Sequence, residues 1–282
     1  MNAPSAPWHR AIAATIAAHY TLPQIPVIVL GGSAAHGTPD AFSDIDVITY
    51  WEGPVDPALL DPPPLAAMGA ERFTSRAVAD GAWLEQYFIG TLKIDVGHVP
   101  FAFAGQILVD VQENLSLDGG AHGFLEGMNT AIVLRGEAAY ANWRTRAATY
   151  PEALREAMIR AQLPFMPRWV PEQHGLVRGD ILHFHELRLS SVKKLVAMVA
   201  ALNGRYFDSS KWKHVGGLLE LCPIAPQGFR TRIDAILSGD PVAGLDDLHR
   251  LIDEVLALVA TTVPSVDLAR AREILNFEVH ST

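Results

Sequence analysis

The sequence is poor in cysteine and in long apolar runs: Cys222 is the single cysteine among 282 residues. One thiol cannot form a disulfide within the chain, and it excludes a zinc site built from several cysteines. No stretch reaches the roughly eighteen apolar residues that a membrane-spanning helix needs, and the first residues lack a basic segment followed by an apolar core. These absences predict a cytoplasmic protein with no membrane association.

Positive charge is scarce in the first half of the chain. The whole sequence has 22 basic and 31 acidic residues, for a net charge of −9, and the segment through Gly136 holds 5 of the basic and 14 of the acidic residues. An acidic half favours a bound metal ion and a cationic acceptor, whereas the net negative charge disfavours nucleic acid as a partner. The segment from Ala141 to Arg232 is basic, which suits a triphosphate.

Apolar patterns divide the chain into two parts. Strand patterns stop after Gly136, and from Glu137 onward the apolar residues recur at helical spacing. The length suits two domains. We therefore predict an α+β protein with a small mixed β-sheet domain, helices on one side, at residues 1–136, and an all-helical bundle domain at residues 137–282. The strands are expected at Val27–Leu30, Asp44–Trp51, Trp83–Ile89 and Leu92–Val99, with a short last one at Ile132–Leu134.

The stretch Gly31-Gly32-Ser33 and the pair Asp44 and Asp46 carry the chemistry of the first part. Side chains two apart on a strand share a face, so the two carboxylates point together and repel each other. That cost is accepted mainly where a divalent cation sits between them. A glycine turn that opens a helix offers backbone N–H donors to phosphate, with the Ser33 hydroxyl beside them.

A third and a fourth acid lie on the later strands. Asp95 shares a face with Lys93 and Gly97, and it would look toward the first two acids if its strand were their neighbour. Glu85 lies on the preceding strand, either as a plain surface acid or as a base that takes a proton from an acceptor. The residues leave both readings of Glu85 open.

Gly32-Ser33, a ten-residue gap and Asp44-Ile45-Asp46-Val47 together resemble the signature of the DNA polymerase β-like nucleotidyltransferase superfamily. Within that superfamily, the sequence most resembles the small-molecule enzymes that modify aminoglycosides or lincosamides. The resemblance implies that Asp95 supplies the third carboxylate and that Asp44 and Asp46 bridge two Mg²⁺ ions. It also implies an NTP co-substrate, expected to be ATP, that is bound in part by Gly32 and Ser33.

The implied reaction moves a nucleoside monophosphate onto a hydroxyl of a small molecule, such as an aminoglycoside-like antibiotic, and releases pyrophosphate. A role in antibiotic resistance would follow from such an acceptor. Asp95 or Glu85 would be the general base. Two alternatives remain: a toxin-like nucleotidyltransferase that acts on tRNA or protein, and a nucleotide sensor without catalysis.

The stretch from Asn203 to Trp212 resembles the helical domain of the same small-molecule enzymes. The resemblance implies that Lys211 reaches the triphosphate, with Lys193 or Lys194 as weaker candidates. A lysine at a helix start in solvent is the alternative reading of Lys211. Trp212 is expected to anchor the packing.

Overall fold

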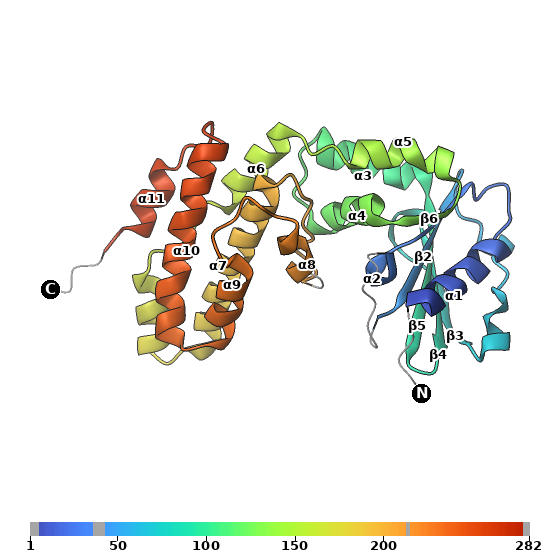
Figure 1. Cartoon of the computed structure of the whole chain (residues 1–282), viewed down its shortest axis with the longest axis horizontal. Coiled ribbons are helices and arrows are strands. Elements are labelled where there is room, and N and C mark those ends of the chain that lie inside the picture. Colours follow the sequence, from blue (N-terminus) through green and yellow to red (C-terminus); the bar gives the residue numbers. More distant parts are fainter. Residues whose placement is uncertain (1–5, 36–42, 213–214, 279–282) are drawn as a thin grey trace. The chain divides into compact units, whose positions relative to one another are not determined.

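The chain divides into two compact units in the computed structural model, which describes residues 6–35, 43–212 and 215–278 (Figure 1). The first unit comprises Met1–Asn114 and Phe124–Thr149, and the second comprises Leu115–Gly123 and Tyr150–Thr282. The predicted boundary between residues 136 and 137 differs from this division, because helix α5 (Glu137–Ala147) belongs to the first unit. There its Tyr140 ring lies 5.8 Å from that of Tyr50 in the sheet.

The first unit is built on one mixed sheet of six strands in the order β3-β4-β5-β2-β1-β6. Strands β2 and β5 run parallel, and the other neighbours are antiparallel. The mixed sheet is therefore confirmed, with β3 as a strand that the sequence did not predict. The strands are β1 (Val27–Leu30), β2 (Ile45–Trp51), β3 (Glu71–Ala77), β4 (Trp83–Ile89), β5 (Leu92–Pro100) and β6 (Ile132–Arg135).

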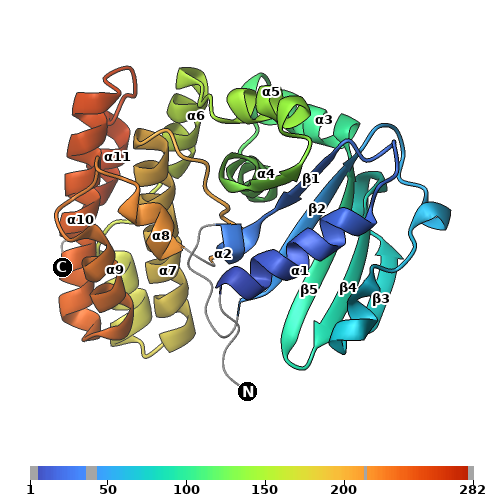
Figure 2. The ribbon, with the colours of Figure 1, turned by 45° about the vertical axis from the view of Figure 1, so that its right-hand side comes forward.

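Helices lie on both faces of this sheet, whereas the sequence predicted one. Helix α1 (Ala6–His19) crosses one face, where Ile12 and Ile16 are fully buried in the same apolar cluster as Val47 and Val96 (Figure 2). Odd and even residues of a strand point to opposite faces, so Asp46 and Tyr50 of β2 face the other way. On that side the Tyr50 ring stacks 5.2 Å from that of Phe101, the first residue of α3 (Phe101–Gln112).

The remaining elements of the first unit are short. They are α2 (Gly32–Ala35), α3 (Phe101–Gln112), the larger part of α4 (Gly119–Thr130), and the 3₁₀ turns at Pro57–Leu59, Pro64–Met68 and Ala79–Gly81.

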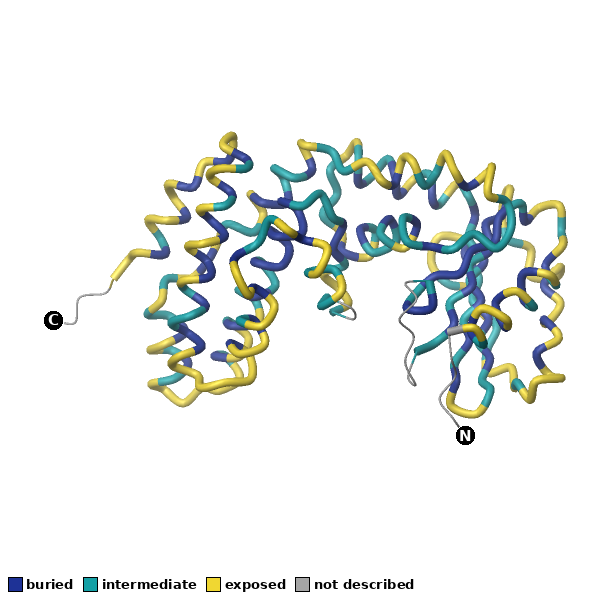
Figure 3. The backbone as a smooth tube through the Cα atoms, viewed as in Figure 1, coloured by how far each residue is buried: buried dark blue, intermediate teal, exposed yellow. Residues whose placement is uncertain are grey.

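Among the described residues, the regular elements of the second unit are all helices, as predicted. Figure 3 shows the continuous buried stretch along α7 (Ile181–Leu202), which the residues from Leu195 to Leu202 form. They pack against apolar residues of α10 (Pro241–Thr262), such as Leu251 and Val255, in one cluster. The elements are α6 (Glu152–Gln162), a π-helix (Val170–Val177), α7 (Ile181–Leu202), α8 (Val215–Glu220), α9 (Phe229–Ser238), α10 (Pro241–Thr262) and α11 (Ala269–Leu275).

Across the described residues, no helix combines the length and the apolar character that crossing a membrane requires.

Candidate active site

Three carboxylates converge on one face of the sheet, at the start of β2 and near the middle of β5. The parallel register places Asp46 directly opposite Asp95, and Asp44 precedes β2 with the same strand parity as Asp46. Each of the three offers a carboxylate oxygen, and these oxygens lie within 4.8 Å of one another. All three residues are partly exposed. The expected adjacency of the two strands is confirmed, and the oxygen cluster fits the hard-cation chemistry of Mg²⁺.

The glycine turn lies directly beside this cluster. The backbone N–H of Gly31 donates to the backbone oxygen of Asp46 at 2.8 Å, which holds the turn against β2. Gly32 has a φ of 63°, and a Cβ at that position would lie 2.2 Å from Oδ2 of Asp46. A side chain at this residue would therefore strain the backbone and collide with a carboxylate of the cluster. Glycine at position 32 is what lets the turn and the acid lie together.

Ser33 follows in the first turn of α2 and is 7% exposed. Its Oγ atom has no hydrogen-bond partner within the part of the chain that the structure describes. Buried hydroxyls almost always have a partner, because leaving one unpaired costs about 1–3 kcal/mol. A phosphate oxygen would satisfy this hydroxyl, so the residue present fits the group that the motif predicts.

Lys93 and Gln86 also belong to the cluster, although the sequence did not assign them to it. The Nζ atom of Lys93 lies 3.1 Å from Oδ2 of Asp44 and 2.8 Å from Oδ2 of Asp95. Gln86 donates from Nε2 to the other oxygen of Asp95 at 3.0 Å. Burial alone would lower the pKa of Lys93, but the hydrogen bonds and charges of the two carboxylates outweigh it and raise that pKa above its ordinary value.

Two signals in the sequence pointed to these residues. Lys93 shares a strand face with Asp95 two positions later. The turn at Gly90-Thr91 makes Ile89 and Leu92 partners, and counting back along both strands then pairs Gln86 with Asp95.

Glu85 does not join the cluster. It pairs with Val96 across the β4–β5 ladder, so it faces the side of the sheet that α1 covers. It is fully buried there, ion-paired with Arg72, and it accepts a hydrogen bond from the hydroxyl of Tyr20. The reading of Glu85 as a surface acid is therefore wrong, and a role as the base in this site does not fit its placement.

His98 and Thr49 are fully buried on the same face of the sheet as Glu85, and the three residues form a buried polar layer. His98 lies with Nε2 at 3.4 Å from Oε2 of Glu85 and with Nδ1 at 2.7 Å from the hydroxyl of Thr49. Desolvation would raise the pKa of Glu85, but the hydrogen bonds from His98 and Tyr20, together with nearby positive charge, hold it below its ordinary value. The layer thus holds an ionised carboxylate inside the unit.

Lys211 belongs to the helical unit, in the loop before α8. Its backbone N–H donates to Oδ1 of Asp208 at 3.1 Å, so Asp208 fixes the backbone that presents it. The role of Lys211 toward a triphosphate stays a prediction.

The neighbouring candidates make contacts within their own unit. Lys193 lies 5.5 Å from the ring centre of Trp212, and Lys194 donates to the backbone oxygen of Pro164. Trp212 is partly buried against the helical core, in line with the packing role expected for it.

A buried cation stands out in the helical unit. Arg188 of α7 is 1% exposed, and its guanidinium lies 4.8 Å from the ring centre of Phe184. None of its three side-chain nitrogens has a hydrogen-bond partner among the described residues. Burial lowers the pKa of this group.

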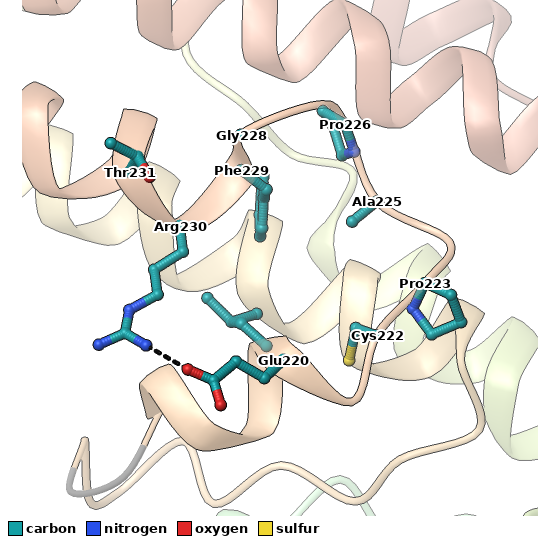
Figure 4. A pocket seen from close by; sticks show the side chains of 10 residues that line it. Glu220, Cys222, Pro223, Ala225, Pro226, Gly228, Phe229, Arg230 and Thr231 are labelled. Carbon is teal, nitrogen blue, oxygen red and sulfur yellow. Dashed lines mark hydrogen bonds and ion pairs between the residues drawn. The ribbon is translucent and has the colours of Figure 1, made fainter.

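A shallow pocket of about 270 Å³ lies between α8 and the start of α9 (Figure 4). Its two charged side chains are paired with each other, since Arg230 donates to Glu220 at 2.8 Å. Cys222 lines it as well, and its thiol donates to the backbone oxygen of Leu218. The charges of this pocket are satisfied within the protein, which favours the acid cluster as the functional site.

Comparison with known proteins gives a match to one sequence family and matches to solved structures. The sequence family described as a domain of unknown function, DUF4037, matches residues 121–213, which is less than half of the chain and excludes the acid cluster. A crystal structure of a nucleotidyltransferase-like protein from Exiguobacterium sibiricum 255-15 aligns with 95% of this chain and 78% of its own, at 11% identity and a TM-score of 0.38. No curated protein matches. At these similarities, nothing about activity follows from either match.

Proposed function

We propose that this protein is a metal-dependent nucleotidyltransferase that moves a nucleoside monophosphate from an NTP to a hydroxyl of a small-molecule acceptor. One observation carries the proposal: Asp44, Asp46 and Asp95 converge beside a glycine turn whose Gly32 admits no side chain. Paired acids next to N–H donors suit a cation and a phosphate bound together.

Each part of the site has a role in this reaction. The turn at Gly32 and the hydroxyl of Ser33 would hold phosphate oxygens, and carboxylates of the cluster, with Asp46 beside the turn, would hold Mg²⁺. Bound Mg²⁺ neutralises charge on the phosphates and on the leaving group. The acceptor hydroxyl oxygen forms a bond to the α-phosphorus, the bond from that phosphorus to the bridging oxygen breaks, and pyrophosphate leaves with the electron pair. Asp95 takes the proton of the hydroxyl, because Glu85 lies on the opposite face.

The test is incubation with α-labelled ATP, GTP, CTP and UTP and a panel of aminoglycosides, lincosamides and bulk tRNA. We expect label on a small molecule, pyrophosphate in equal amount, and loss of both with Asp46→Asn. Label on tRNA or on the protein would keep the transfer chemistry and replace the acceptor. Binding of nucleotide without pyrophosphate release for any acceptor would identify a sensor and refute the proposal.

A further inference from the structure

Lys93 places a positive charge inside the acid cluster itself. We propose that its ammonium permanently occupies one of the two cation positions of this site, so that the protein binds one divalent ion with its nucleotide rather than two. The inference rests on the proposed function, because it concerns the ions of the same site.

The contacts of Lys93 are those that a bridging cation would make. Nζ is within hydrogen-bond distance of one oxygen of Asp44 and one of Asp95, at 3.1 and 2.8 Å. Asp95 lies on β5, and Asp44 directly precedes β2, the strand that pairs with β5. The ammonium therefore joins the two strands across the gap that a second ion would otherwise bridge.

Both oxygens of Asp95 accept a hydrogen bond from a neighbouring side chain. Oδ2 accepts from Lys93 at 2.8 Å, and Oδ1 accepts from the Gln86 amide at 3.0 Å. A second ion at Asp95 would share an oxygen with either Lys93 or Gln86, and on either oxygen the nearby ammonium would repel it. Each oxygen keeps a second lone pair, so Asp95 can still take the proton of the acceptor hydroxyl.

The charge of the cluster points the same way. One ammonium cancels one of three carboxylate charges, so a single divalent ion would neutralise the two negative charges that remain. Lys93 cannot diffuse away as a metal ion can, because it lies on β5, which is paired on both sides by β4 and β2. Its side chain is 33% exposed, so solvent screens it only in part.

We place the divalent ion beside Asp46. Oδ2 of Asp46 lies next to the Gly32 turn, on the side where Ser33 and the phosphates are proposed to bind. Lys93 bridges the pair formed by Asp44 and Asp95 and so serves as a positioning residue for the acceptor side. The divalent ion and the ammonium would together supply the positive charge that two metal ions supply in a two-metal site.

The stoichiometry of Mn²⁺ tests this directly. Mn²⁺ is titrated into the full chain in the presence of saturating α,β-methylene-ATP, and electron paramagnetic resonance measures the free Mn²⁺ at each step. We expect one bound ion per chain in the wild type and in Lys93→Arg, and two in Lys93→Met. Arg76→Met, which removes a positive charge from the exposed face of β3 in the same unit, serves as the control and should bind one ion.

The outcomes separate the two proposals. Two ions in the wild type would overturn the inference and leave the proposed function standing, and this readout needs no variant to fold. One ion in Lys93→Met would also overturn it, because the ammonium would then not be what excludes the second ion. No ion in the wild type with nucleotide present would refute the proposed function itself.

Discussion

Replacing Gly32 by alanine tests the geometry on which the candidate site depends. The new Cβ would lie 2.2 Å from Oδ2 of Asp46, and real Cβ contacts essentially never fall under 3.0 Å. The carboxylate must therefore move by most of an ångström. A φ of 63° adds a backbone cost of about 1 kcal/mol for a residue with a side chain. The variant should thus fold with slightly reduced stability and a displaced Asp46.

The expected loss of function is far larger than the loss of stability. A misplacement of about 1 Å in a catalytic arrangement can cost on the order of 100-fold in rate. We expect Gly32→Ala to lose about 100-fold in nucleotidyl transfer and to bind Mn²⁺ more weakly, while its free energy of unfolding falls by only about 1–2 kcal/mol. Thermal unfolding, Mn²⁺ titration and label transfer measure the three quantities on one preparation.

Gly31→Ala is the matched control. A Cβ at Gly31 would lie 3.8 Å from its nearest neighbour, Cβ of Asp46, which is an ordinary contact. Gly31 is also not among the glycines with a positive φ. It should keep transfer and Mn²⁺ affinity within a few-fold of the wild type. Equal losses in both variants, or wild-type Mn²⁺ binding in Gly32→Ala, would refute the reasoning.

Three further predictions follow from other contacts. Asp46→Asn should abolish Mn²⁺ binding without lowering the melting temperature, because it relieves repulsion between carboxylates. Glu85→Gln should lower the free energy of unfolding at neutral pH by roughly 2 kcal/mol. The pKa of Glu85 lies below its ordinary 4.5, so the stability that Glu85 adds is complete above pH 4.5 and is lost as the pH falls through the pKa of the folded state. In urea titrations at a series of pH values, the free energy of unfolding of the variant should therefore fall less steeply toward acid pH than that of the wild type. Arg188→Met should raise the free energy of unfolding by about 1–4 kcal/mol in urea, since it removes a buried unpaired charge.

Each of these has a result that would contradict it. For Asp46→Asn it is a drop in melting temperature as large as the one from a core truncation. For Glu85→Gln it is an acid limb that superimposes on that of the wild type. For Arg188→Met it is a clear destabilisation, which would show that the guanidinium has a partner in solution.

The strands of the site were predictable because their signals are local. Val27–Leu30 and Trp83–Ile89 are continuous apolar or alternating runs bounded by glycine or proline, and the structure has both with the predicted limits. Strand β3 was missed because it is an exposed edge of mostly polar residues, and Phe73 is 72% exposed. Its ladder with β4 depends on a partner that no local pattern indicates.

The site was predictable only as far as strand parity and adjacency could be inferred. Parity put Asp44 with Asp46, but the place of Asp95 depended on β2 and β5 being neighbours, which is a property of the whole sheet. Glu85 was left open although the same hairpin register pairs it with Val96, next to Asp95 and on the opposite face. Lys93 was visible as a residue on the correct face, yet its distance to Asp44 arises only when the two strands pair.

The buried layer behind the sheet also protects the alignment of the acids in front. His98 and Asp95 sit on the same strand with opposite parity, so shifting β5 by a single residue would turn Asp95 inward and His98 outward. His98 is held by Thr49 of β2 and by Glu85 of β4, so the slip would break polar contacts to both neighbouring strands at once. The contacts of His98, on the face opposite the acid cluster, thus fix the register of β5. We expect variants of Thr49 to disturb first the alignment of Asp95 with Asp46.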